Sequence, residues 1–578
     1  MLELIKNLKF AWKYVKGQKF KVILVGIIGL IMAILGVIVP ILSAQLIVNL
    51  TSNKLAQLLF IAIIIFFVEI FRNIIRCFND YLLNIIYRET FNNIQVSLGK
   101  EMLKLKNKTL DSNSSGFFIQ RLMGDTSKLS SIFNIISINM SNIISNIGVL
   151  IAVLIINVWF FLYMFLTVVV LFILTKLQYV AYYSSDKKFR SEEDTVSGFT
   201  GEVVRGARDI KMLNAENSFI NVMNSKIKKL NQSRYKMNAV NRKYNLIIES
   251  AINFSDLFLI IMLIIFLKNN IITIPIAMVI YSYSLKNVNI IYSINDLLNY
   301  IQNFNLSAER IIDIMDNKTF EKEKFGNVHL DKVDGNFEFK NVNFSYGDNK
   351  VLNNLSFKIN ANSTVAFVGK SGAGKSTIFN LIDKMYDVDS GEILIDGVNI
   401  NELDKDSIRK NITVINQSPY IFNLSIRDNL KLVKESLTEE EMTNACKMAC
   451  LDDFINTLPD KYDTIVGEGG ITLSGGQKQR LAIARALIQK TEIILFDEAT
   501  SALDNETQKE IQQAIHNMQG EYTILIIAHR LSTIIDSDRI LFLNDGHIEA
   551  EGTHEELLEN CPDYKHLYEK ELKTNTNE

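Results

Sequence analysis

The chain has 578 residues, and its 61 Lys and Arg side chains nearly balance 63 Asp and Glu, for a formal net charge of −2. This length exceeds what one hydrophobic core supports, so we expect two or more domains. The balanced charge supplies no basic field for a nucleic-acid partner. The four cysteines have no spacing typical of a zinc site or a disulfide framework.

The N-terminal stretch MLELIKNLKFAWKYVKGQKFK is basic and amphipathic. It predicts an interfacial helix over about 1–18 that lies on a membrane with Trp12 as an anchor, the alternative being a solvated helix. The apolar run that follows is too long for a cleavable signal peptide.

Long apolar runs predict six membrane spans. Residues 22–53 and 129–175 contain no charged side chain, and the second run is long enough for two spans, because each needs ~20 residues. The predicted spans are 20–50, 55–75, two spans within 132–177, 246–267 and 271–291.

Lys and Arg are concentrated in the two long connections. Residues 88–128 contain 7 of them and residues 176–243 contain 14, whereas the short connections contain only Lys54 and Lys268. Positive charge marks the cytoplasmic side, so we expect the long connections and both termini to be cytoplasmic. Apolar residues at helical spacing in these connections predict membrane helices that continue into the cytoplasm and turn at about 112–120 and 207–217.

After a charged linker the composition becomes that of a soluble α/β domain, with FEFKNVNFSY and STVAFVG as strands. We therefore predict a polytopic α-helical membrane domain over 1–315, a linker over 316–330 and an α/β domain over 331–578.

The strand in AFVGKSGAGKST runs into a glycine-rich loop that matches the phosphate-binding P-loop at every fixed position. Backbone N–H groups of such a loop wrap a β-phosphate, Lys375 neutralises β/γ charge, and the Ser376 hydroxyl can ligate Mg²⁺. The predicted ATP-binding residues are Gly369, Lys370, Ser371, Gly372, Ala373, Gly374, Lys375, Ser376 and Thr377.

A second apolar strand in TEIILFDEAT ends in two acids. Asp497 is placed to hold Mg²⁺ through water. Glu498 is then able to accept a proton from the attacking water or to orient it.

The stretch LSGGQKQRLAIARAL predicts a helix whose glycine-rich N-terminus offers free N–H groups to an anion. With the P-loop and the paired acids, it resembles the signature of the ABC transporters. Essentially the whole chain resembles an exporter-type half-transporter of that superfamily. The resemblance implies six membrane helices fused to an ABC-type ATPase that uses ATP and Mg²⁺ to drive export.

The resemblance also implies roles for residues that alone have ordinary alternatives. Tyr346 in NFSYGD would stack on adenine, and Gln417 in INQSPYIF would contact Mg²⁺ or water. Asp504 in SALD would lie at a dimer interface, and His529 in IIAHRLS would touch the γ-phosphate. Alone, Tyr346 would read as a turn aromatic, Gln417 as a solvated loop residue and His529 as a core histidine, but the motifs occur in family order.

In the family, the signature contacts a nucleotide that is held by the P-loop of a second nucleotide domain. The chain would then supply half of each of two ATP sites. Because Glu498, His529 and the signature are all intact, we favour a homodimer over a heterodimer. The predicted contacts in trans are Ser474, Gly475, Gly476, Gln477 and Asp504.

Polar residues within the spans predict a cargo cavity, since intramembrane polar groups are costly. Glu249 and Asp256 are seven residues apart and share a helix face. A slightly acidic, aromatic cavity suits an amphipathic, cationic cargo such as a peptide or drug. The alternative is that these groups pair between helices. The candidate cavity residues are Glu249, Asp256, Asn139, Asn142, Tyr283 and Asn287.

The leading function is therefore ATP-driven export of an amphipathic compound by alternating access. A lipid flippase or an importer on the exporter fold is the alternative, and an ATP-gated channel is weaker. Six spans exclude a soluble ABC ATPase that acts on DNA or ribosomes. We expect no peptidase domain before the interfacial helix. The abundance of Ile, Asn and Lys points to an AT-rich bacterium and hence to a bacterial cell membrane.

Overall fold

The computed structural model describes residues 2–51, 54–113, 115–287, 289–316, 320–467, 470–497, 505–527 and 534–575. The chain divides into two compact units. We call Met1–Leu103 with Asn113–Thr319 the membrane unit, and Lys104–Ser112 with Phe320–Glu578 the α/β unit.

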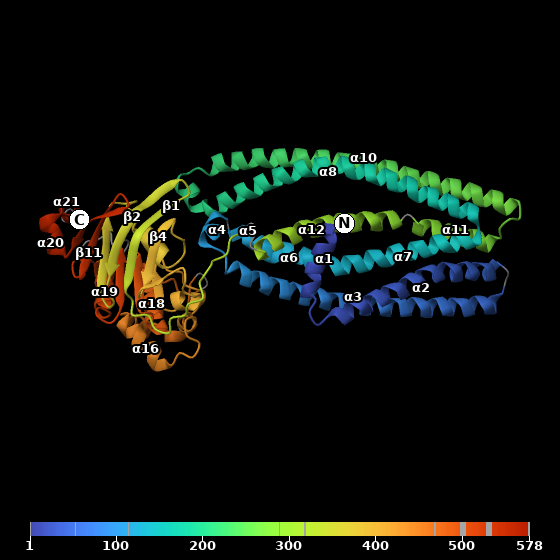
Figure 1. The fold of residues 1–578 in the computed structure, drawn as a ribbon. Coiled ribbons are helices and arrows are strands. Elements are labelled where there is room, and N and C mark those ends of the chain that lie inside the picture. Colours follow the sequence, from blue (N-terminus) through green and yellow to red (C-terminus); the bar gives the residue numbers. More distant parts are fainter. Residues whose placement is uncertain are drawn as a thin grey trace. The chain divides into compact units, whose positions relative to one another are not determined.

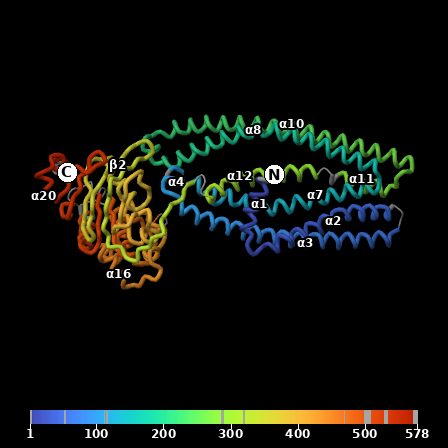
Figure 2. The backbone as a smooth tube through the Cα atoms, in the orientation of Figure 1, coloured from blue at the N-terminus to red at the C-terminus, as the bar shows by residue number. Residues whose placement is uncertain are grey.

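Among the described residues, six helical stretches of the membrane unit are long and apolar enough to cross a membrane. Helices α3, α8 and α10 have 48, 48 and 53 residues, far more than the ~20 that a bilayer requires. Figures 1 and 2 show α8 and α10 side by side along most of their length. The helices are α1 (Leu2–Tyr14), α2 (Lys19–Thr51), α3 (Leu55–Met102), α5 (Ser115–Gln120), η1 (Arg121–Asp125, a π-helix), α6 (Thr126–Ser130), α7 (Ile132–Ile156), α8 (Val158–Arg205), α9 (Ala207–Met212), α10 (Glu216–Lys268), α11 (Ile274–Asn287) and α12 (Asn289–Met315).

A six-stranded sheet with the order β12-β11-β3-β10-β9-β6 forms the centre of the α/β unit. Its strands are parallel except for β12, and the order β2-β1-β4-β5 describes a second, antiparallel sheet. The strands are β1 (Phe337–Tyr346), β2 (Asn349–Ile359), β3 (Thr364–Gly369), β4 (Ser390–Ile395), β5 (Val398–Asn399), β6 (Ile412–Ile415), β7 (Leu424–Ser425), β8 (Ile465–Val466), β9 (Ile493–Asp497), β10 (Thr523–Ile527), β11 (Arg539–Asn544) and β12 (His547–Gly552).

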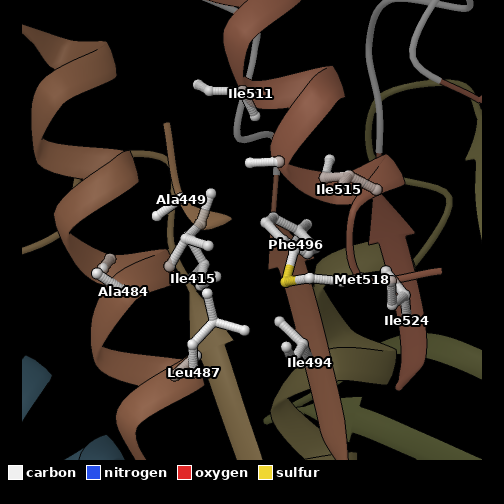
Figure 3. Close-up of a cluster of buried hydrophobic side chains, with 14 of the residues drawn as sticks. Ile415, Ala449, Ala484, Leu487, Ile494, Phe496, Ile511, Ile515, Met518 and Ile524 are labelled. Atoms are coloured by element: carbon white, nitrogen blue, oxygen red, sulfur yellow. The ribbon is translucent and has the colours of Figure 1, made fainter. Parts of the chain in front are cut away.

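The central strands are apolar on both faces because both faces are covered. Phe367 and Leu495 pack toward the antiparallel sheet, whereas Ile494 and Phe496 pack against helices (Figure 3). The helices of this unit are α4 (Asn107–Ser112), α13 (Lys375–Ile382), α14 (Lys405–Arg409), α15 (Ile426–Lys431), α16 (Glu439–Met448), α17 (Asp452–Thr457), η2 (Lys461–Asp463), α18 (Gly475–Gln489), α19 (Asn505–His516), α20 (His554–Asn560) and α21 (Pro562–Asn575).

One short segment of the α/β unit comes from the first long connection between membrane helices. Leu105 forms an antiparallel bridge with Lys322, and the N–H of Lys106 donates to the Glu321 carbonyl at 3.0 Å. The Lys106 ammonium lies 3.2 Å from a carboxylate oxygen of Asp387. We predicted a turn at about 112–120. The segment that joins the α/β unit ends at Ser112, and α5 belongs to the membrane unit.

Candidate active site

The glycine-rich loop connects the end of β3 to the start of α13. Gly372 has a φ of +86° and Gly374 a φ of +99°, a region that side-chain-bearing residues rarely adopt. A Cβ on Gly374 would also lie 2.6 Å from Leu352 Cδ2. Glycine is therefore required at this turn, and it lets the backbone N–H groups at the start of α13 face an anion.

Lys375 is the first residue of α13 and only 6% exposed. Its ammonium donates to the Gly369 carbonyl at 2.8 Å and to the Lys370 carbonyl at 3.0 Å. The side chain thus lies back along the loop, and its positive charge adds to that of the helix N-terminus. This arrangement favours a bound phosphate.

Ser376 and Asp497 meet beside the loop, although 121 residues separate them in sequence. The Ser376 hydroxyl donates to the Asp497 carboxylate at 3.4 Å. Asp497 is the last residue of β9, next to β10 in the parallel sheet. A hydroxyl and a carboxylate are hard oxygen ligands of the kind that Mg²⁺ prefers, so the residues present fit this ion. The predicted catalytic residues Glu498 and His529 lie outside the described residues.

Tyr346 lies at the end of β1, is 39% exposed, and belongs to an aromatic cluster. Its ring meets Phe344 edge-on with 4.8 Å between centroids and Tyr386 with 5.2 Å. Asn380 of α13 donates to the Tyr346 hydroxyl at 3.2 Å. The aromatic side chain is thereby tied to the P-loop helix, as a residue that stacks on a base requires. Sequence reasoning missed Asn380 and Tyr386, because neither belongs to a motif.

The signature helix α18 is linked to the loop that contains Gln417. Gln479 is buried, and its side-chain amide donates to the Gln417 carbonyl at 3.2 Å. Farther along α18, Arg485 donates to the carbonyls of Tyr420 and Asn429, each at 3.1 Å. Gln479 and Arg485 position the segment after Gln417, and sequence reasoning did not identify them.

Ser474 forms the N-cap of α18 through a reciprocal capping box with Gln477. Ser474 and Gly475 are exposed. Helix α18 contacts β6, the sheet's edge strand, and Figure 3 shows Ala484 and Leu487 of α18 beside Ile415 of β6. Three strand spacings, about 14 Å, separate β6 from β3, the strand before the P-loop. Asp504 lies outside the described residues.

The membrane unit contains polar cavities that include several predicted cargo residues. Glu249 lines a cavity of about 450 Å³ between α8, α10 and α12. Asn139 and Asn142 line a cavity of about 550 Å³ between α7 and α12. Asp296, which sequence reasoning did not identify, lines both cavities.

The other predicted cargo residues lie elsewhere. Asp256 lines a different, very small cavity, which Tyr163 and Ser255 also line. Tyr283 is fully buried and lines none of these cavities, because its face of α11 packs on α2 and its hydroxyl donates to the Val37 carbonyl at 2.9 Å. Asn287 ends α11, and its side chain lies outside those described.

Comparison with known proteins identifies the family. The family described as the ABC transporter transmembrane region matches residues 22–289, and the family described as the ABC transporter matches residues 352–501. The chain belongs to the ABC transporter superfamily. Both of its characteristic parts are present in one polypeptide.

Several curated proteins are similar to this ABC transporter. An ATP-dependent lipid A-core flippase of Haemophilus influenzae (strain 86-028NP) is 41% identical over 294 residues, 50% of each chain. A Beta-(1-->2)glucan export ATP-binding/permease protein, NdvA, of Rhizobium johnstonii is 44% identical over 43% of each chain. Multidrug resistance protein pgp-1 of Caenorhabditis elegans is 44% identical over 44% of this chain and 19% of its own. This chain thus spans about half the length of the bacterial relatives it matches.

The solved structure of a bacterial Atm1-family ABC exporter with ATP bound has a similar fold. It superposes with a TM-score of 0.84 at 23% identity, covering 96% of this chain and 99% of that one. The six apolar helices and the C-terminal α/β ATPase domain therefore form an ABC exporter fold, as the sequence predicted.

Proposed function

We propose that this ABC transporter chain is one half of an ATP-driven exporter that moves an amphipathic compound, a peptide or drug-like molecule, out of the cytoplasm. The observation that carries the proposal is the meeting of Ser376 with Asp497 beside Lys375 in a chain that also has six apolar spans. A phosphate cradle with an adjacent metal-ligating pair is the machinery of nucleotide hydrolysis.

In this mechanism the N–H groups of the P-loop and the Lys375 ammonium hold the ATP phosphates. Tyr346 stacks on adenine. Ser376, Asp497 and Gln417 would hold Mg²⁺, which supplies neutralisation of phosphate charge. Each of these residues acts by position, so most of the catalytic gain comes from orientation and electrostatics.

Glu498 and His529 complete the proposed chemistry. Glu498 orients the attacking water and accepts its proton, and His529 contacts the γ-phosphate. We assign these roles from the family motifs in the sequence.

We further propose that two chains share each ATP site. The exposed N-terminus of α18 keeps the N–H groups of Gly475 and Gly476 outside its capping box, and the helix lies beside the far edge strand rather than beside β3. Ser474, Gly475, Gly476 and Gln477 would therefore contact the γ-phosphate on a second chain, with Asp504 at the interface. The intact motifs favour a homodimer. A heterodimer is the alternative.

Coupling follows from differential affinity. ATP binds the closed pair of nucleotide domains better than the open pair, so it shifts the membrane domains toward the outward state, and hydrolysis resets them. We propose the bacterial cell membrane as the location, with both termini cytoplasmic, because the long connections contain most of the loop Lys and Arg.

A lipid flippase is the second candidate, and the name of the Haemophilus influenzae relative favours it. The carboxylates that line the membrane cavities argue against a cargo with an anionic headgroup. An importer on the same fold or an ATP-gated channel would share the nucleotide chemistry, so transport direction has to be measured.

The test is transport by the full chain in inside-out proteoliposomes. We expect ATP-dependent uptake of an amphipathic peptide against its gradient, and loss of uptake in Glu498→Gln and Lys375→Ala. Lys410→Ala is the matched control, because within the described ranges the exposed Lys410 ammonium pairs with the exposed Asp406 of α14 and with no other carboxylate. Passive conductance in Glu498→Gln with ATP bound would contradict the exporter and favour a channel. Flipping of labelled lipid without peptide uptake would favour the flippase.

A further inference from the structure

The polar cavities of the membrane unit adjoin one another at α12. Tyr292 and Asp296 line both the cavity of about 450 Å³ and the cavity of about 550 Å³. A third cavity of about 280 Å³ shares Gln178 and Asn241 with the first. Volumes of roughly 300–1,000 Å³ are those of drug-sized ligand sites. Shared polar side chains join these three cavities into one polar region, whereas the small cavity at Asp256 shares only the apolar Ile252 with it.

This region carries negative charge without a compensating cation. Among the described residues that line the three cavities there are two carboxylates, Glu249 and Asp296, and no Lys, Arg or His. Neither carboxylate forms an ion pair with any residue in the described ranges. Glu249 lies within the fifth predicted span, where a carboxylate is costly unless it serves a ligand or a pathway. A bound ammonium group would supply the missing positive charge.

The neutral side chains of the region present hydrogen-bond acceptors. Asn139 and Asn146 are more than nine-tenths buried, and their amide groups donate to the carbonyls of Ile135 at 3.0 Å and Asn142 at 2.7 Å. A carbonyl only accepts, so the –NH₂ group must face it and the amide oxygen is left for another partner. Ser293 is 6% exposed and lines the same cavity, and its hydroxyl forms no hydrogen bond with the residues described.

The position of the region suits a cargo that arrives from the cytoplasm. The first cavity is lined by Thr175 and Gln178 at the end of the fourth predicted span, and by Asn245 and Glu249 at the start of the fifth. Tyr292 and Asp296 follow the sixth predicted span directly. By the charge distribution of the connections, these are the cytoplasmic ends of all three spans.

We propose that this region binds a cargo that carries a primary amine, with the ammonium group between Glu249 and Asp296. Hydrogen-bond donors elsewhere on the cargo, such as peptide N–H groups, face the asparagine and serine acceptors, and Tyr292 covers its apolar part. The proposal rests on the proposed export function for its role, and it narrows the cargo to amine-bearing compounds such as basic peptides.

The test is peptide binding to the full chain in phosphatidylcholine nanodiscs without ATP, measured by fluorescence anisotropy. One probe is an amphipathic decapeptide with an acetylated N-terminus, a neutral nitrobenzoxadiazole label and one lysine. The matched probe has acetyl-lysine at the same position. We expect the lysine peptide to bind the wild type at least tenfold more tightly than the acetylated peptide. In Glu249→Gln/Asp296→Asn we expect the two affinities to become equal.

Two controls keep the result specific. Asp256→Asn removes a membrane carboxylate that lines a different cavity, and it should bind the lysine peptide like the wild type. Retained binding of the acetylated peptide by the double variant shows that the membrane unit is folded. Equal binding of both peptides by the wild type overturns the proposal, as does undiminished lysine-peptide binding by the double variant. Displacement of the lysine peptide by phosphatidylglycerol, with no effect of the double substitution, would instead assign the region to a lipid headgroup.

The result is separable from the export test. Normal binding with no ATP-dependent uptake would contradict export and leave the amine site standing. Active uptake with wild-type binding by the double variant would contradict only the amine site.

Discussion

Asn429 organises the loop that follows Gln417, and its replacement gives a quantitative test of this structure. The side chain is fully buried in α15. Its amide donates to the carbonyls of Phe422 at 3.0 Å, Leu424 at 3.3 Å and Ser425 at 3.0 Å. Its oxygen accepts from the Phe422 N–H at 3.2 Å and from the Arg485 guanidinium.

Asn429→Ala would remove all five contacts. The Phe422 N–H and one Arg485 N–H, whose bonds to Asn429 are partly buried, would lose their acceptor inside the unit, and a donor left without a partner costs about 1–3 kcal/mol. Alanine offsets about 0.5 kcal/mol through its higher helix propensity. We therefore expect a loss of about 3 kcal/mol in the unfolding free energy. At about 2–4 °C per kcal/mol for a domain of this size, the melting temperature of the α/β unit should fall by about 6–12 °C.

The assay is thermal unfolding of the full chain in nanodiscs, followed by intrinsic fluorescence. Asn423→Ala is the matched control, because Asn423 lies in the same loop and is exposed, and it should change stability by less than about 0.5 kcal/mol. A fall below about 2 °C in Asn429→Ala, or an equal fall in both variants, would refute the assignment of Asn429 as the centre of this loop.

Three further substitutions test the nucleotide unit. Ser474→Arg should leave ATP binding at the P-loop nearly intact but abolish phosphate release, and equal loss of both would contradict the contact in trans. Gly374→Ala places a Cβ at a φ of +99° and 2.6 Å from Leu352, so we expect ATP affinity by calorimetry to weaken about tenfold, and unchanged affinity would be inconsistent with this geometry. Burial raises the pKa of Asp383 to about 6 from the ordinary 3.8, against the opposing charge of Arg409. The folded state therefore holds this proton at higher pH than the unfolded chain, and the resulting stabilisation is complete below about pH 4 and lost as the pH rises through 6. Asp383→Asn should flatten this fall in melting temperature between pH 4 and 6, and identical slopes in the two proteins would contradict it.

The parts of the fold that sequence predicts best are those with local physical signals. A membrane span needs a long apolar run, so the six helices could be read directly. The P-loop needs glycine at positions such as Gly374, and its strand and helix flank it in sequence. Asp497 follows an apolar strand, and the parallel sheet brings it to Ser376 because the carboxyl ends of parallel strands meet at one edge.

The parts that sequence does not reveal depend on helix rotation and on long-range contacts. Seven-residue spacing placed Glu249 and Asp256 on one face, yet they line different cavities because the facing helices differ along α10. Tyr283 was expected beside the cargo but faces α2. Asp296 lies just beyond the predicted end of a span, where the apolar signal has already faded. Gln479 donates to the carbonyl of Gln417, 62 residues earlier in the chain, and no local sequence signal predicts such a contact.

The pairing of Leu105 with Lys322 changes what counts as the nucleotide domain. The chain passes from one unit to the other three times, at residues 103–104, 112–113 and 319–320. Two consecutive domains joined by a single linker would have one such crossing. A protein cut at an engineered protease site after Asp316 would still hold its ATPase part through residues 104–112. Conversely, a fragment that begins at residue 331 would lack both Lys106 and the segment 321–323 with which it pairs, and Asp387 would lose one of its two cations. The ATPase is thus a discontinuous domain, because it includes residues 104–112 from the connection between two membrane helices.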